Sequence, residues 1–188
     1  MKSLGLAPLV LLLAGCVTRQ PDHFYVIDPA PAAVAAPRSQ FDRQVTLRVT
    51  IPSLVDRGEM IIAGQNGVSI MDHERWAAPL VDMINNALSR DIEQRRSDVV
   101  VLPRSADKTG IPLSKIAVEI DRVSARLSEH LSIDTHWRVT DAKTGKETLG
   151  RDTFVSPQQP QNYADVAAAL SACIAQLADR LAREIPTG

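Results

Sequence analysis

The chain has 188 residues, of which 45% are hydrophobic and 23% charged, a composition that predicts a folded domain with a substantial apolar core. Its formal net charge is −1 at pH 7, and no basic stripe runs through the sequence. A protein that binds nucleic acid is therefore not expected.

The N-terminus has the layout of a signal peptide that ends at a lipidated cysteine. Lys2 supplies a positive charge, and residues 4–13 form an apolar run that is shorter than the about 20 residues needed to span a bilayer. Ala14 and Gly15 come directly before Cys16, an arrangement that resembles a bacterial lipobox. The alternative is a secretory signal with a coincidental cysteine.

The lipobox interpretation predicts the processing and the location of the chain. Residues 1–15 are removed, and two or three acyl chains on Cys16 anchor the protein to a membrane. Residues 16–23 form the lipidated tether, whose polar part reaches at most ~25 Å at about 3.5 Å per residue. Because Val17 is not acidic, the resemblance to sorted lipoproteins favours the periplasmic face of the outer membrane. Cys173 then has no cysteine to pair with, and its apolar helical stripe predicts a buried core residue.

Residues 24–188 are predicted to form a single α+β domain, in which all the predicted strands precede the C-terminal helix. Alternating apolar and polar residues, with Pro52, Pro103 and an Asn66-Gly67 pair between the runs, predict strands and a hairpin. The predicted strands are 24–27, 45–51, 60–63, 68–71, 98–102, 116–120, 131–139 and 148–155.

Two segments have the apolar spacing of helices. Residues 76–92 have apolar side chains three and four positions apart, and Pro79 suits a first turn, so regular helix is expected from near Ala77. Asn162 is predicted to cap a C-terminal helix whose apolar stripe covers residues 163–181. The order of elements favours an α+β fold, in which two helices pack on one face of an antiparallel β-sheet.

No motif in the sequence predicts catalysis or metal binding. His130 and His136 lie on or near one predicted strand, but without further ligands they are interpreted as part of a solvated face. The Gly64–Gly67 spacing fits a hairpin better than a phosphate-binding loop, because no Lys-Ser/Thr pair follows it. No Gly-x-Ser-x-Gly nucleophile motif is present. We therefore expect a protein that is not an enzyme and has no metal or cofactor besides the lipid on Cys16.

Large apolar residues at unusual positions are the remaining candidates for function. Leu54 and Val55 are adjacent in a predicted loop and are followed by Arg57, while Trp76 stands at the predicted start of a helix. Each apolar residue could close the core or form part of a docking patch, because exposed apolar clusters mark partner surfaces. These four residues are the candidate partner interface.

The order of four motifs after the lipobox resembles the ABC-type transport auxiliary lipoprotein family, which includes lipoproteins of paraquat-inducible lipid transport systems. The Arg75–Leu80 run, Arg-Trp-Ala-Ala-Pro-Leu, is the most specific of these motifs. The family commonly has an aromatic residue where Val55 stands, so this chain departs from the pattern there. The four motifs are Phe24–Ile27, Ile51–Arg57, Met60–Ile62 and Glu74–Leu80.

The resemblance implies a non-catalytic accessory subunit of an intermembrane phospholipid transport system. In such systems an inner-membrane ABC transporter works with an MCE-domain protein that bridges the periplasm, and the lipoprotein docks that bridge at the outer membrane. By family analogy, a ring-shaped homo-oligomer would suit a tubular partner. An outer-membrane scaffold for lipopolysaccharide assembly or envelope integrity is the alternative function. A periplasmic hydrolase is a third hypothesis, for which no motif is present.

Overall fold

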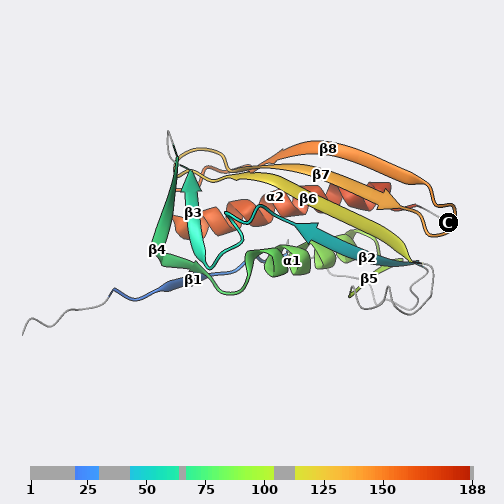
Figure 1. The fold of residues 1–188 in the computed structure, drawn as a ribbon, viewed down its shortest axis with the longest axis horizontal. Coiled ribbons are helices and arrows are strands. Elements are labelled where there is room, and N and C mark those ends of the chain that lie inside the picture. The colour runs from blue at the N-terminus through green and yellow to red at the C-terminus, as the bar shows by residue number, and fades with distance from the viewer. Residues whose placement is uncertain (1–19, 30–42, 64–66, 104–112, 187–188) are drawn as a thin grey trace, which may run out of the picture.

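The computed structural model describes residues 20–29, 43–63, 67–103 and 113–186, which contain eight strands and two helices (Figure 1). The strands are β1 (His23–Tyr25), β2 (Arg43–Thr50), β3 (Glu59–Ala63), β4 (Val68–Trp76), β5 (Val99–Leu102), β6 (Ser114–Ser124), β7 (Ser132–Thr140) and β8 (Glu147–Val155). The helices are α1 (Leu80–Arg95) and α2 (Tyr163–Glu184).

Some of the sequence predictions fall outside these residues. The predicted signal peptide, Cys16 and the first part of the tether precede the described region. Asn66 of the predicted hairpin also lies outside it, although β3 and β4 on either side pair antiparallel as predicted.

A five-stranded sheet with the order β5-β2-β6-β7-β8 forms the larger layer of the fold. Alternate side chains of β2, β6 and β7 are buried, as the period-two patterns predict. Helix α1 packs on β2 and β5, and α2 packs on β7 and β8, so the main core lies between helices and sheet. The predicted α+β class is confirmed.

The strand directions differ from the antiparallel sheet that was expected. β6, β7 and β8 are antiparallel, but β2 runs parallel to both β5 and β6. After β2 the chain forms β3, β4 and α1 before it returns to the sheet, and such a long crossover with a helix is what parallel pairing needs. Whether two strands pair parallel or antiparallel therefore depends on the segment that connects them. The alternation of apolar and polar residues within one strand does not reveal this.

A separate three-stranded sheet has the order β1-β4-β3. β4 continues to Trp76, five residues beyond the predicted end at Met71, because β1 pairs with its last residues in parallel. Trp76 therefore ends a strand instead of starting a helix, and α1 begins only at Leu80. Pro79 occupies the cap position of α1, one residue before the helix.

The helix ends are stabilised by specific side chains. The Oδ1 atom of Asn162 accepts a hydrogen bond of 2.9 Å from the Asp165 amide, so the predicted cap of α2 is confirmed. At the other end of α2, the Arg96 guanidinium donates to the carbonyl oxygens of Ala182 at 3.0 Å and Ile185 at 2.8 Å. Arg96 thus joins the residue after α1 to the last turn of α2, where unpaired carbonyls favour a cation.

A buried tryptophan marks the junction between β7, β8 and α2. The Trp137 ring nitrogen donates to Asp152 at 2.7 Å, and the Arg180 guanidinium lies 5.0 Å from the ring centroid. Gly150 stands opposite Trp137 in β8, and a methyl group at this position would overlap the indole ring. The absence of a side chain at Gly150 is therefore a requirement of the packing.

Candidate functional site

The loop between β2 and β3, residues 52–58, carries three of the four predicted interface residues. Its first residues form a turn, in which Pro52 accepts hydrogen bonds from the amides of Val55 at 3.0 Å and Asp56 at 3.1 Å. Leu54 at the tip of this turn is 50% exposed, whereas Val55 is half-buried against the core. The turn thus separates the two adjacent apolar residues, and Leu54 alone presents a large apolar surface to solvent.

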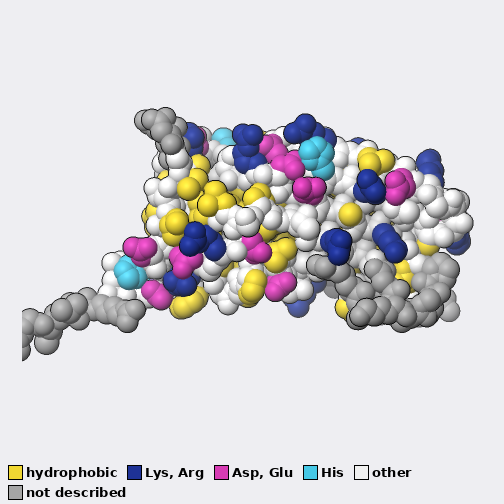
Figure 2. Space-filling model, viewed as in Figure 1, with side chains coloured by type: hydrophobic (Ala, Val, Ile, Leu, Met, Phe, Trp, Pro, Cys, Tyr) yellow, Lys and Arg dark blue, Asp and Glu magenta, His cyan; other side chains and the backbone are white. Residues whose placement is uncertain are grey.

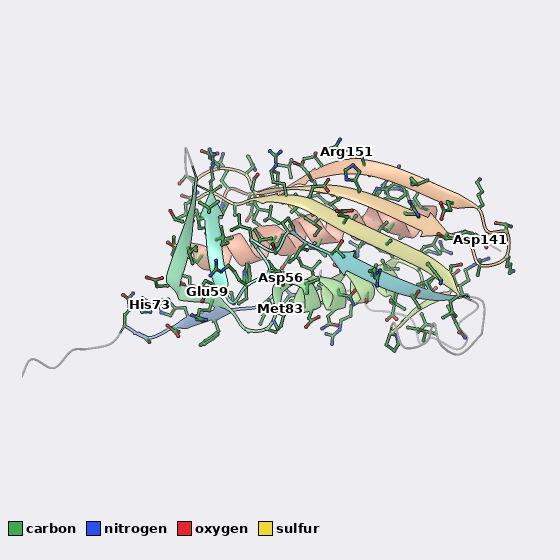
Figure 3. All side chains as sticks on the ribbon, in the orientation of Figure 1. Asp56, Glu59, His73, Met83, Asp141 and Arg151 are labelled. Carbon is green, nitrogen blue, oxygen red and sulfur yellow. The ribbon has the colours of Figure 1, made fainter. Side chains whose placement is uncertain are left out.

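The second half of the 52–58 loop is fixed to its neighbours by polar contacts. Asp56 accepts a hydrogen bond of 3.4 Å from the Val81 amide and so helps to satisfy the start of α1, where Pro79 provides no side-chain cap. Arg57 pairs with Glu59 at 3.2 Å, and Glu59 also pairs with Arg75 at 3.1 Å. Figure 3 shows Asp56 and Glu59 where the loop, β3 and the start of α1 come together.

The carboxyl group of Glu59, the first residue of β3, is made more acidic by its hydrogen bonds and by neighbouring arginines. A backbone hydrogen bond, followed by the hydrogen bond from Arg57, lowers the pKa of the Glu59 carboxyl below its usual value. Glu59 is therefore ionised at neutral pH and pairs with Arg57 of the loop and Arg75 of β4. The surface that results combines one apolar side chain with several charges.

Trp76 lies beside this loop but below the surface. Its amide donates to the Gly58 carbonyl at 2.7 Å, which brings the end of β4 against the 52–58 loop. The side chain is 7% exposed and belongs to the hydrophobic core, together with Leu80 and Leu170. Of the two interpretations made from the sequence, core closure describes its position in this structure.

The first strand is attached to β4 by side-chain contacts that sequence reasoning missed. Asp22 contacts His73 at 3.1 Å, His23 contacts Glu74 at 3.1 Å, and the Tyr25 hydroxyl donates to Glu74 at 2.6 Å. We call these three contacts the β1 latch. His73, at the outer end of the three-stranded sheet, is labelled in Figure 3.

The β1 latch shifts the acidity of its two best-buried members. Burial of the Tyr25 hydroxyl, reinforced by its hydrogen bond to Glu74, raises its pKa to about 12. Burial tends to raise the pKa of Glu74, but hydrogen bonds from Tyr25 and His23 outweigh it, and the net pKa is lowered. Glu74 is therefore ionised at neutral pH and accepts from both neighbours.

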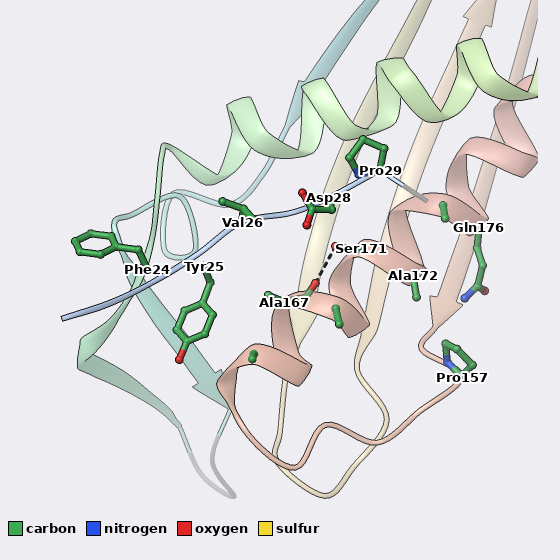
Figure 4. A pocket seen from close by; sticks show the side chains of 13 residues that line it. Phe24, Tyr25, Val26, Asp28, Pro29, Pro157, Ala167, Ser171, Ala172 and Gln176 are labelled. Carbon is green, nitrogen blue, oxygen red and sulfur yellow. Dashed lines mark hydrogen bonds between the residues drawn. The ribbon is translucent and has the colours of Figure 1, made fainter. Parts of the chain in front are cut away.

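The segment of residues 24–29 crosses the surface of α2, and an apolar groove lies between this segment and the helix (Figure 4). Residues 24–29 form one wall, Pro157 and Gln176 lie at the opposite side, and the floor consists of small side chains of α2. The groove has a volume of about 690 Å³. We call it the α2 groove; its floor residues are Ala164, Ala167, Ala168, Ser171, Ala172 and Ala175.

Exposed apolar side chains gather at the same end of the molecule. Phe24 is 63% exposed, and Val26 in the groove wall is also exposed. Val68 and Ile70 are exposed on β4, and Figure 2 shows hydrophobic side chains clustered over the β3–β4 end, with charged side chains of both signs beside them and elsewhere on that face. This end therefore has the larger share of the apolar surface in that view.

The residues that were expected to be chemically inert have ordinary structural roles. His136 pairs with Asp121 at 2.6 Å on the exposed face of the sheet, and the His130 ring lies 2.8 Å from the Ser156 carbonyl. Cys173 is fully buried, and this burial raises the pKa of its thiol to about 12. Within the described residues, no cluster of three or more His, Cys, Asp or Glu side chains could hold a metal ion.

A family model described as ABC-type transport auxiliary lipoprotein component matches residues 25–182. The chain belongs to this family. The match covers Tyr25 of the β1 latch with its partner strand β4, the 52–58 loop and nearly all of α2, so most of the candidate surfaces are parts of the family domain. The family is an auxiliary component of transport and not a known enzyme class.

Two solved structures share the fold at low sequence identity. An uncharacterised protein is 17% identical with a TM-score of 0.71, and the similarity covers 89% of this chain and 100% of that one. Protein XCC0632 from Xanthomonas campestris is 16% identical with a TM-score of 0.61, over 85% of this chain and 92% of that one. At these identities the similarity establishes the fold alone. No curated protein matches the chain.

Among the described residues, none of the helices has the length and apolar character needed to cross a membrane.

Proposed function

We propose that this chain is an outer-membrane-anchored periplasmic lipoprotein and a non-catalytic accessory subunit of an intermembrane phospholipid transport system. In this role it docks an MCE-domain protein that spans the periplasm and works with an inner-membrane ABC transporter. The observation that carries the proposal is the membership of residues 25–182 in the ABC-type transport auxiliary lipoprotein family.

The membrane anchor in this proposal is Cys16. The cysteine follows an apolar run and two small residues, as lipid attachment requires, and two or three acyl chains hold a protein stably on a bilayer. Val17 supports sorting to the outer membrane. Because the tether to Phe24 is short, partners of the folded domain must themselves come close to that membrane.

The docking surface we propose is the exposed part of the 52–58 loop. Leu54 offers an apolar contact, and Arg57 and Glu59 beside it offer charges that can select a partner. Val55 and Trp76 support this loop from below and would act through its position. A ring of several copies would present such loops around a tubular partner, and we include this homo-oligomer in the proposal.

The experiment is cross-linking in whole cells, followed by purification of a tagged chain and identification of its partners by mass spectrometry. We expect an MCE-domain protein, and we expect its recovery to fall about tenfold or more for Leu54→Asp, because a charge at an interface centre removes more than 1.4 kcal/mol. Leu149→Asp is the matched control, since Leu149 is also an exposed leucine, 60% exposed against 50% for Leu54, but lies on β8. It should leave recovery unchanged.

Other outcomes would contradict the proposal. Recovery of lipopolysaccharide-assembly or envelope-integrity proteins without an MCE-domain protein would favour a scaffold role. A Cys16→Ala chain that still fractionated with the outer membrane would reject the anchor. If Leu54→Asp and Leu149→Asp behaved alike, docking would not involve the 52–58 loop.

A further inference from the structure

We propose that the α2 groove binds one acyl chain of a membrane phospholipid that has an ammonium headgroup, as phosphatidylethanolamine has. The groove lies between residues 24–29 and α2, away from the 52–58 loop that we propose as the docking surface. The inference rests on the proposed function only in that the Cys16 anchor places the groove near a membrane.

Three of the polar side chains around the groove, those of Tyr25, Ser171 and Gln176, already have partners within the protein. The Ser171 hydroxyl donates to the Ala167 carbonyl at 3.0 Å, and the Gln176 amide donates to the Val155 carbonyl at 2.8 Å. The Tyr25 hydroxyl is engaged by Glu74 in the β1 latch. A polar ligand would have to compete for these groups, whereas an alkyl chain needs no hydrogen bonds and gains from leaving water.

The dimensions of the groove suit a single chain. Alanine and serine side chains on α2 leave its backbone close to the surface, so a narrow ligand can lie along the helix (Figure 4). At about 30 Å³ for a group the size of a water molecule, 690 Å³ holds on the order of twenty such groups. A membrane acyl chain is of that size. The volume is also typical of small-ligand sites.

The charge at the groove favours one class of headgroup. Asp28 is exposed at the edge, and among the described residues that line the groove none is basic. A free fatty acid or an anionic phospholipid would bring its negative charge near this carboxylate, and Arg90, which shares an adjoining pocket with Asp28, does not line the groove. The headgroup of phosphatidylethanolamine has no net charge, because its ammonium balances its phosphate, and the ammonium can pair with the Asp28 carboxylate.

The groove lies close to the predicted lipid anchor, and this closeness indicates where the bound lipid comes from. Phe24, which lines the groove and is largely exposed, follows the predicted lipid attachment site by only eight residues. At about 3.5 Å per residue, the groove entrance stays within ~30 Å of the anchored cysteine. The nearest reservoir of acyl chains is therefore the membrane that holds the anchor.

The test uses the full lipidated chain in vesicles of phosphatidylethanolamine and phosphatidylglycerol. A trace of phosphatidylethanolamine carries a photoreactive diazirine at the end of one acyl chain, and mass spectrometry locates the adducts after illumination. We expect adducts within residues 164–176 and 24–29. The chain's own anchor carries no diazirine, so labelling identifies the lipid as a component of the vesicle.

Substitutions in the groove floor should remove the labelling. Ala168 is exposed on α2, and an indole at this position would occupy the volume that the chain needs, so Ala168→Trp should reduce adducts about tenfold. Gln94→Trp, on an exposed position of α1, is the matched control and should label like the unmodified chain. Phe24→Ser tests the opposite wall and should also reduce labelling.

Flotation of the vesicles separates failure of this inference from failure of the anchor. A chain that floats but acquires no adducts in the groove overturns the inference and leaves the anchor intact. If the chain does not float, the same labelling in mixed micelles decides the inference, because no anchor is needed there. Equal labelling by a diazirine-bearing phosphatidylglycerol would overturn the headgroup assignment. The assignment would also be overturned if the Asp28→Lys variant showed the same ratio of labelling by the two lipids as the unmodified chain.

Discussion

The two sheets of this protein are stabilised by different interactions. In the five-stranded sheet, β2, β6 and β7 bury alternate side chains beneath α1 and α2. In the three-stranded sheet, β4 is largely exposed along its first half, and β1 has only three residues, which the β1 latch attaches to β4. Burial dominates in the first region, whereas the second combines a few buried side chains, such as Met60 and Trp76, with the polar contacts of β1 and exposed apolar side chains on β4. Regions of the second kind are the ones that open or bind partners most readily.

The largest expected effect is the loss of a core side chain in the five-stranded region. Ile174 on α2 is fully buried, so Ile174→Ala should lower the free energy of unfolding by about 3 kcal/mol through lost burial and a new cavity. Ile70→Ala, on β4 where Ile70 is 43% exposed, should cost less than about 0.5 kcal/mol. Urea denaturation measures both, and equal losses would contradict the comparison.

The next largest effect on stability is expected from replacing a glycine by alanine in each of the two regions. Gly150→Ala should destabilise the protein by about 2 kcal/mol, because its methyl group would overlap the Trp137 ring in the packed sheet. Gly67→Ala, at the start of the β3–β4 return, meets nothing within 4 Å and should be close to neutral. Thermal unfolding of the two variants compares the packing of the two regions with the same chemical change.

The start of α2 joins the two regions and should show an intermediate effect. Asn162→Ala removes the cap and should cost about 1 kcal/mol. The Tyr163 hydroxyl beside it lies 3.1 Å from the Met71 sulfur on β4, so fraying at this end should increase hydrogen exchange in β4 as well as in α2. Faster exchange in α2 alone would mean that the three-stranded sheet is independent of this cap.

The smallest effect is confined to the β1 latch and depends on pH. The folded-state pKa of Glu74 is lowered, so its contribution is present above the usual value of 4.5 and is lost as pH falls through the lowered pKa. The hydrogen-exchange protection factors at residues 23–25 should therefore decrease as pH falls below 4.5, while those of β7 remain high. Glu74→Gln should abolish this pH dependence, and persistence of the dependence would assign it to another group.

Parts of the fold that depend on local pattern could be predicted from the sequence. The alternation in β2, β6 and β7 and the stripe and cap of α2 are local, and each was confirmed. The end of β4 could not be predicted, because residues 72–75 are polar and become strand only through pairing with β1, far away in the sequence.

The candidate surfaces were predictable to different degrees for the same reason. Leu54 is exposed because a local turn projects it, and the adjacent apolar pair in a loop indicated this possibility. The α2 groove joins residues 24–29 to a helix near the other end of the chain, so no local pattern could reveal it. The run of alanines on α2 was visible in the sequence, but small residues fit a packed core equally well.

The elongated shape of the domain separates its two ends, and this matters for how it can contact partners. β1 lies at one end of its long axis and the C-terminus at the other, and Arg96 fixes the final turn of α2 (Figure 1). In a chain anchored through its N-terminal segment, as we propose, the end of α2 that Arg96 fixes lies at the opposite end of the domain from the anchored segment, so a partner that binds there would contact the domain far from its anchor.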